Sequence, residues 1–106
     1  MRDLYQTSRF EKDLERLSKS AASRNETGKV KEELALVVGR LIFDVALERR
    51  HGDHELTGEW QGFRDCHVFN DLVLIYRKYN KNAPHKTYGA NALILARIGS
   101  HSELDL

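Results

Sequence analysis

Two helices are predicted in the first half of the chain by apolar residues three or four positions apart. The first series is Phe10, Leu14, Leu17 and Ala21, and the second is Val30, Leu34, Val37 and Leu41, widened by Leu36 and Val38. Ser8 and Glu11 have the spacing of a capping box, so the first helix is expected to begin at Ser8. Asp13 lies off the apolar stripe and is expected to be solvated.

The polar stretch 20–28 predicts a turn before a second helix that begins near Lys29. The two helices are therefore expected to form an antiparallel hairpin, each burying its apolar face against a sheet.

The second half of the chain has the pattern of strands. Residues 63–68, 72–79 and 92–98 are the candidates, and 3–7 form a short strand at the start. A tight turn at 69–71 and a long hairpin loop at 80–91 separate the later strands. The order β-α-α-β-β-β predicts one α+β domain over residues 1–106, with a mainly antiparallel sheet packed on the helical hairpin.

Composition fits a small globular domain. The chain has 106 residues, 41% hydrophobic and 31% charged, and a formal net charge of +1. Its lone Cys66 excludes an intrachain disulfide and is expected to be a small, semi-buried hydrophobe. No apolar run is long enough for a signal peptide or a bilayer span, so a cytoplasmic protein without membrane contact is expected. Because the net charge is small, any patch that faces nucleic acid must arise when folding gathers basic residues.

Candidate chemistry lies at the ends of the predicted strands, and includes His54, Arg64, Asp65, His67, Asp71, Arg97 and His101. Strand alternation puts Arg64 and His67 on opposite faces, so a site that uses both is expected at a rim of the sheet. Histidine suits proton transfer near neutral pH, and arginine suits phosphate oxygens. Such residues can cleave RNA without a metal if the 2′-hydroxyl of the RNA attacks its own phosphate.

Each of these residues also has a structural interpretation. Asp65 is expected to pair with Arg64 or to cap a turn, and Asp71 to stabilise its turn. Trp60 and Tyr76 are expected in the core, whereas His51 and His85 are expected to be solvated. His51, Asp53 and His54 resemble the start of a zinc site, but no C-x-x-C or H-E-x-x-H spacing accompanies them, so no metal or other cofactor is predicted.

Three ordered motifs resemble those of YafQ-like toxins, a branch of the RelE superfamily. Residues 54–68, HELTGEWQGFRDCHV, are similar to the pattern H-x-L-x-G-x-W-x-G-[YF]-R-D-x-H-V. Residues 71–76, DLVLIY, resemble D-x-x-L-I-Y, and residues 97–104, RIGSHSEL, resemble R-x-G-[ST]-H-x-x-L. The resemblance implies a RelE-like fold and the toxin of a type II toxin–antitoxin pair. It further implies cleavage of messenger RNA in the ribosomal A site by metal-free chemistry.

The resemblance also implies roles and partners. Family positions carry over onto His54, His67, Asp71 and His101. His101 is expected to be the general acid, Asp71 or His67 the general base, and His54 a group that orients substrate or stabilises charge. Arg64 and Arg97 would position phosphate or support the fold. The implied partners are the ribosome, messenger RNA and a DinJ- or RelB-like antitoxin. The antitoxin would contain a ribbon-helix-helix part that binds operator DNA, and the toxin would contact that DNA only through the antitoxin.

Two other functions are compatible with the same fold. One is a gyrase-directed, ParE-like toxin, against which the proton-transfer residues argue. The other is a catalytically inactive, antitoxin-binding co-repressor. The chain also departs from the family pattern in two places. Asp105 stands where an aromatic residue often follows the C-terminal motif, and the loop around 84–89 is longer than usual.

Overall fold

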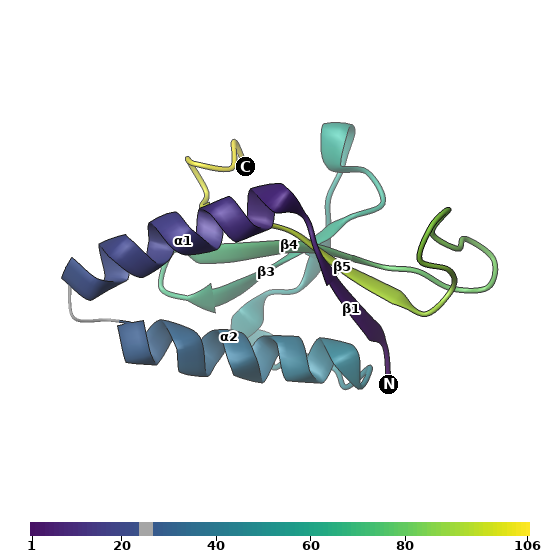
Figure 1. Ribbon diagram of the computed structural model, residues 1–106, viewed down its shortest axis with the longest axis horizontal. Coiled ribbons are helices and arrows are strands. Elements are labelled where there is room, and N and C mark those ends of the chain that lie inside the picture. The colour runs from purple at the N-terminus through teal and green to yellow at the C-terminus, as the bar shows by residue number, and fades with distance from the viewer. Residues whose placement is uncertain (24–26) are drawn as a thin grey trace.

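A twisted five-stranded sheet carries two helices on one face in the computed structural model (Figure 1). The structure describes residues 1–23 and 27–106. The helices are α1 (Ser8–Ser23) and α2 (Thr27–Ile42), with two single-turn 3₁₀ helices, η1 (Arg49–His51) and η2 (Gly58–Trp60). The strands are β1 (Asp3–Gln6), β2 (His54–Glu55), β3 (Arg64–Phe69), β4 (Leu72–Lys78) and β5 (Ala92–Ser100).

The strand order across the sheet is β1-β5-β4-β3-β2. β1 runs parallel to β5, with Asp3 opposite Ala92 and Gln6 opposite Leu95, and all other neighbours are antiparallel. This confirms the predicted α+β fold and its element order. The short edge strand β2 was not predicted, because two residues carry too little alternation to be recognised.

The main core lies between the helices and the sheet. Phe10 of α1 and Val37 and Leu41 of α2 are almost wholly buried against side chains from the three long strands. The strand residues of this core are Cys66, Val68, Leu72, Leu74, Tyr76, Leu93, Leu95 and Ile98. The burial of Tyr76 confirms its expected place.

The opposite face of the sheet is covered only in part. Val73, Ile75 and Ala96 form a second, smaller core there with Leu104 of the C-terminal tail. Leu56, Trp60 and Phe63, from the segment between β2 and β3, pack against it and remain partly exposed. No helix of the described residues covers the remainder of this face, towards β1 (Figure 1).

The helix predictions hold in outline, with local corrections. α1 begins at Ser8, but its cap is Thr7, whose hydroxyl accepts a 3.0 Å hydrogen bond from the Phe10 N–H. The expected turn over 20–28 is wrong at 20–23 and 27–28, which are helical, and residues 24–26 lie outside the described part of the chain. Leu36 is 38% exposed and does not widen the buried stripe. The side chain of Ala21 is also outside the described part.

His51 is another correction, because its side chain is buried instead of solvated. Only 1% of the residue is exposed, and neither ring nitrogen has a hydrogen-bond partner among the described residues. Burial lowers the pKa of His51, so the imidazole is neutral in the folded protein at neutral pH. None of the helices described is long and apolar enough to cross a membrane.

Asp13 was expected in solvent but is 5% exposed and joins α1 to the end of β5. Its carboxylate accepts hydrogen bonds from Arg97 Nε at 2.7 Å, from a second Arg97 nitrogen at 3.0 Å and from the Ile98 N–H at 3.1 Å. Burial alone would raise the pKa of Asp13, but the bonds from Arg97 and Ile98 outweigh it and hold the pKa below its ordinary value. The carboxylate is therefore ionised whenever the protein is folded near neutral pH.

We predict that Asp13→Ala lowers the free energy of unfolding by about 3 kcal/mol, because it leaves the Arg97 guanidinium buried without its partner. Urea denaturation at pH 7 measures the change. Glu15→Ala on the exposed side of α1 is the control, with an expected loss within about 0.5 kcal/mol. Equal stability of the two variants would show that the Asp13–Arg97 contact does not hold the fold.

Candidate functional site

The candidate site residues gather at one rim of the sheet, as the strand alternation indicated. His54 lies opposite Asp65 in the β2–β3 pair, and His67 lies two residues further along the same face of β3. Leu72 pairs with Ser100, which brings the β3–β4 turn beside the end of β5. Residues 54, 65, 67, 71 and 101, distant in sequence, are thereby neighbours.

His101 and Asp71 form the best-defined polar contact of this rim. His101 Nδ1 lies 2.8 Å from Asp71 Oδ1, so Nδ1 is protonated and donates a hydrogen bond to the carboxylate. The other ring nitrogen, Nε2, is left for a substrate. The ring of His67 lies 5.1 Å from that of His101 between centroids, tilted by 49°. Two imidazoles, one of them bonded to a carboxylate, therefore stand side by side.

His54 is oriented by the backbone of the segment before it. Its Nδ1 donates to the Gly52 carbonyl oxygen at 2.8 Å, which again leaves Nε2 as the free nitrogen. Gly52 has a φ of +53° and closes the single turn of η1. A glycine suits this position because L side chains rarely adopt such a φ.

Asp65 lies beneath the three histidines and is 3% exposed. Its Oδ1 is 3.0 Å from His54 Nδ1, but that N–H is directed at Gly52, and Oδ1 has no hydrogen bond among the described residues. Burial raises the pKa of Asp65, and the nearby His54, His101 and His67 act in the opposite direction. The expected pairing of Asp65 with Arg64 is wrong. The alternation along β3 already placed Asp65 on the face of His67, and that signal identifies it as part of the site.

A polar cleft of about 590 Å³ opens over this rim. His54, Asp65 and His101 line it together with Trp60, and the C-terminal residues 104–106 form another wall. Trp60 therefore combines packing on the second core with a place at the cleft. Neither His67 nor Asp71 lines the cleft itself, and both reach it through their contacts with His101.

The two candidate arginines are held by carboxylates. Arg64 Nε donates to Asp53 Oδ1 at 3.1 Å, on the face of β3 opposite His67, as expected from alternation. Tyr76, through its hydroxyl, shares the same oxygen. Arg97 lines the cleft but is 12% exposed at its side chain and bonds to Asp13. The contact that each arginine makes in this structure supports the fold.

Cys66 points into the main core, where burial raises the pKa of its thiol to about 12. The thiol is therefore protonated at neutral pH and is not a ready nucleophile. In the described part of the chain, no cluster of three or more His, Cys, Asp or Glu side chains has the arrangement needed to hold a metal ion.

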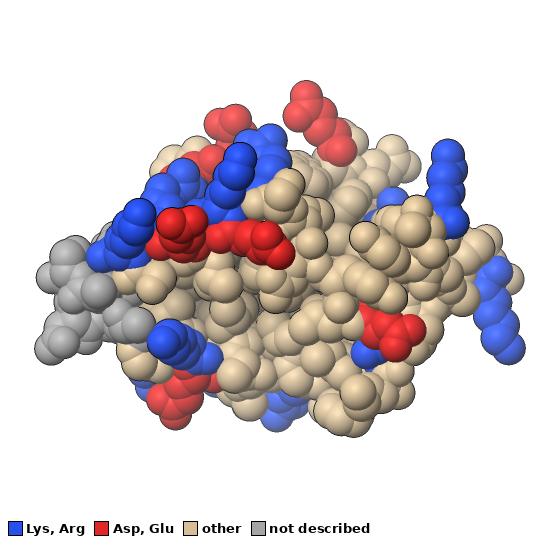
Figure 2. All heavy atoms as spheres, viewed as in Figure 1, with Lys and Arg blue, Asp and Glu red and all other residues tan. Residues whose placement is uncertain are grey.

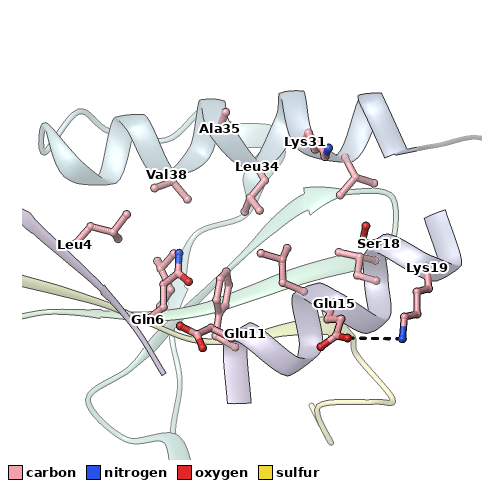
Figure 3. Close-up of a pocket in the computed structure, with 15 residues that line it drawn as sticks. Leu4, Gln6, Glu11, Glu15, Ser18, Lys19, Lys31, Leu34, Ala35 and Val38 are labelled. Atoms are coloured by element: carbon pink, nitrogen blue, oxygen red, sulfur yellow. Dashed lines mark ion pairs between the residues drawn. The ribbon is translucent and has the colours of Figure 1, made fainter. Parts of the chain in front are cut away.

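A second hollow, of about 690 Å³, lies between α1 and α2 and reaches β1 (Figure 3). Leu34 and Val38 point into it from α2, Leu4 comes from β1, and Leu14 and Leu17 come from α1. Its rim carries charges of both signs, including the Glu15–Lys19 ion pair at 3.6 Å. Figure 2 shows that the surface between the two helices is mostly uncharged. We call this hollow the helical groove.

Comparison with known proteins gives the same picture over the whole chain. Residues 2–106 match the family described as "Bacterial toxin of type II toxin-antitoxin system, YafQ". The chain belongs to the YafQ family of toxins. The predicted resemblance is confirmed, and it extends beyond the three motifs to the N-terminal helices.

Relatives with the YafQ name cover different parts of the chain. The mRNA interferase toxin YafQ of Escherichia coli K12 is 29% identical over 93 residues, which are 88% of this chain and 95% of that protein. A Haemophilus influenzae protein that carries the YafQ name is 51% identical over 37 residues, 35% of this chain and 36% of that protein.

Solved structures of YafQ-family proteins have the same fold. The crystal structure of YafQ from Escherichia coli BL21(DE3) matches with a TM-score of 0.72 and 28% identity over 98% of both chains. A metal-bound toxin from Helicobacter pylori matches with a TM-score of 0.74 and 34% identity, covering 98% of this chain and 99% of that one. The DinJ–YafQ complex of Escherichia coli contains a chain that matches with a TM-score of 0.71 and 30% identity over 98% of each.

We predict that Asp65→Asn stabilises the protein at neutral pH and impairs RNA cleavage. Because burial raises its pKa, the Asp65 carboxylate destabilises the fold at pH values above that pKa, and the penalty disappears as the group is protonated. The variant should therefore unfold at a higher urea concentration than wild type at pH 7 and at an equal one below about pH 3.8, the ordinary value of the group. Urea midpoints between pH 3 and 8 test this. A wild-type midpoint at pH 7 equal to or above that of Asp65→Asn would contradict it.

Proposed function

We propose that this chain is an endoribonuclease that cuts messenger RNA in the ribosomal A site by metal-free acid–base chemistry. The observation that supports this most is the contact of His101 with Asp71 beside the ring of His67. It supplies two proton-transfer groups side by side, one of them oriented by a carboxylate. The name mRNA interferase toxin, given to the Escherichia coli relative, agrees with this chemistry.

The proposed reaction transfers one proton at each end of the scissile phosphate. An imidazole nitrogen of His67 removes the proton of the 2′-hydroxyl, the O2′–P bond forms, and the P–O5′ bond breaks. His101 gives its Nε2 proton to the leaving O5′. The products are a 2′,3′-cyclic phosphate and a 5′-hydroxyl, and His67 ends protonated while His101 ends neutral. Adjacent rings suit these roles because each nitrogen must come within about 3 Å of its oxygen.

The carboxylates support this division of roles. Asp71 accepts a hydrogen bond from the Nδ1–H of His101, so its role is to fix the tautomer of that ring and to stabilise its charged form. The role of general base then falls to His67. Asp65 stabilises positive charge on the histidines around it, and His54 presents Nε2 at the cleft for the phosphate. Arg64 and Arg97 contribute by holding β3 and β5 in place through Asp53 and Asp13.

The proposed partner that restrains the activity is a DinJ-like antitoxin, because a similar toxin has been solved in a complex with DinJ. Contact with operator DNA would then occur only through a ribbon-helix-helix part of the antitoxin. We assign the helical groove to an amphipathic helix of the antitoxin, whose apolar side would cover Leu14, Leu34 and Val38. The charges of both signs on the rim suit the mixed polar flank of such a helix.

We predict that His101→Ala lowers messenger RNA cleavage at least about 100-fold, because a positioned general acid contributes about 10²–10⁴-fold to the rate. Induction of the wild-type chain should arrest growth and produce cuts inside translated codons. Primer extension on induced messages measures both position and extent. Ser102→Ala, one residue further on the exposed tail, is the control and should cut as the wild type does. Cleavage by His101→Ala at the wild-type rate would disprove the assignment, and arrest without RNA cuts would indicate another target.

We predict that Ala35→Arg, which fills the helical groove from an exposed position on α2, weakens antitoxin binding by about 2 kcal/mol, or about thirtyfold in Kd. Cleavage of messenger RNA should be unchanged. Titration calorimetry with the purified antitoxin measures the affinity. Glu32→Arg, also exposed on α2 but outside the groove, is the charge control. Full affinity of Ala35→Arg would place the antitoxin elsewhere.

A further inference from the structure

A row of aromatic side chains and one arginine, joined by stacked, edge-to-face and cation–π contacts, crosses the sheet on the face opposite the helices. We call it the aromatic row, and its members in spatial order are Trp60, Phe63, Arg77, Tyr79, His85, Tyr88 and Tyr5. β1 turns Leu4 and Gln6 towards the helical groove, which places Tyr5 on the other face. Arg77 alternates with the core residue Tyr76 and shares that face.

The outer half of the aromatic row is built from β1 and the 80–91 loop. The rings of Tyr5 and Tyr88 stack with centroids 3.8 Å apart and planes 10° apart, and His85 stacks on Tyr88 at 4.7 Å. His85 is half-buried, which corrects its expected place in solvent, and its Nδ1 accepts the N–H groups of Thr87 and Tyr88 at 3.0 Å each. These contacts fold the loop onto the sheet. Tyr88 itself is 44% exposed, and because Tyr5 and His85 both stack on it, the accessible part of Tyr88 is the edge of its ring.

The inner half of the row leads to the polar cleft. Tyr79 meets His85 edge-on at 5.1 Å, and the Arg77 guanidinium lies 4.7 Å from the Tyr79 ring and 5.5 Å from the Phe63 ring. Phe63 meets Trp60 edge-on at 5.3 Å, and Trp60 lines the cleft with His54 and His101. A strand of RNA that leaves the cleft at Trp60 would therefore meet flat or cationic groups at every step.

The charge along this path is positive. Residues 77–91 contain Arg77, Lys78, Lys81 and Lys86 and no acidic residue, and the first acidic residue after Asp71 is Glu103. Lys81 and Lys86 are exposed, and no ion pair of Arg77 occurs among the described residues. Figure 2 shows Lys and Arg side chains projecting at the end of the molecule where Figure 1 draws the loop after β4. The small net charge of the whole chain thus conceals a basic surface at this end.

We propose that the aromatic row binds single-stranded messenger RNA next to the cleavage position, with bases on its rings and phosphates on Arg77, Lys81 and Lys86. The proposal rests on the proposed function, since it takes the cleft as the place of cleavage. Partly exposed rings interleaved with cations suit single strands, because every base has a face to stack while a duplex has none free. Continuity of the row with the cleft assigns it to the substrate strand.

Fluorescence anisotropy with a labelled 2′-O-methyl RNA oligonucleotide tests the binding. This probe lacks the attacking hydroxyl, so its affinity does not depend on whether the chain cleaves RNA. The wild type should bind the single strand more tightly than the same sequence as a duplex. Tyr88→Ala should weaken binding about tenfold, because it removes the ring on which Tyr5 and His85 stack and so interrupts the aromatic row, and Tyr88→Phe should not. Lys81→Gln with Lys86→Gln should weaken binding and flatten its salt dependence, because fewer counterions are released.

Two controls separate the surface from general effects. Lys12→Gln with Lys31→Gln removes the same charge from the exposed sides of α1 and α2 and should leave the affinity unchanged. Near-ultraviolet circular dichroism and the thermal midpoint check that Tyr88→Ala remains folded. If both pairs of lysine changes act equally, or if the folded Tyr88→Ala binds as the wild type does, the proposal is wrong.

Cross-linking on the ribosome identifies the strand. A message with 4-thiouridine beside the A-site codon should cross-link to the 77–91 segment, and cross-links to ribosomal RNA alone would overturn the proposal. The outcomes also separate the two proposals of function. Binding along the row without cleavage by the wild type would refute the nuclease and retain the row. Cleavage at the wild-type rate by variants of the aromatic row would refute the role of the row and retain the nuclease.

Discussion

The hydrogen bonds that Asp13 receives from Arg97 and Ile98 fix the geometry on which the site depends. They hold the first helix against the last strand at Arg97 and Ile98, four and three residues before His101. With a further hydrogen bond from Arg16 at 3.2 Å, the buried carboxylate receives four and is satisfied, and the charge of the Arg97 guanidinium is neutralised by the same contact. The contact therefore sets the position of β5 relative to the helical layer. The pairing of β5 with β4 then carries that position to Asp71, the residue that orients His101.

Asp65 presents the opposite case, a buried carboxylate that the fold does not fully satisfy. This destabilising carboxylate lies at the site where three histidines come together. Such a group destabilises the resting fold and stabilises positive charge when a neighbouring imidazole gains a proton. Stability and activity then make opposite demands on the same side chain, which is common at catalytic sites.

Local patterns in the sequence were sufficient for the helices, the three long strands and the rim that joins them. Those features depend on periodicity and on the spacing of motifs, both of which are visible in one dimension. The burial of Asp13 and His51 was not predictable in this way. Asp13 is buried because it contacts the distant Arg97, and His51 is buried because of the packing around η1. Asp65 lies between these cases. Strand alternation correctly predicted the face of the sheet on which Asp65 lies. Its partner was predicted to be Arg64 because the two are adjacent in sequence, but adjacent residues of a strand point to opposite faces.

The parallel pairing of β1 with β5 has a consequence for how the protein folds. The partners Asp3 and Ala92 stand at nearly opposite ends of the chain, so this contact closes one of the longest loops that the sequence permits. During synthesis the helical hairpin emerges long before the strands that cover its apolar faces. Contacts of such large sequence separation form late and slow the folding of a domain. β5 continues from this pairing towards His101, so the strand that leads into the cleft is also the one that makes this long-range contact.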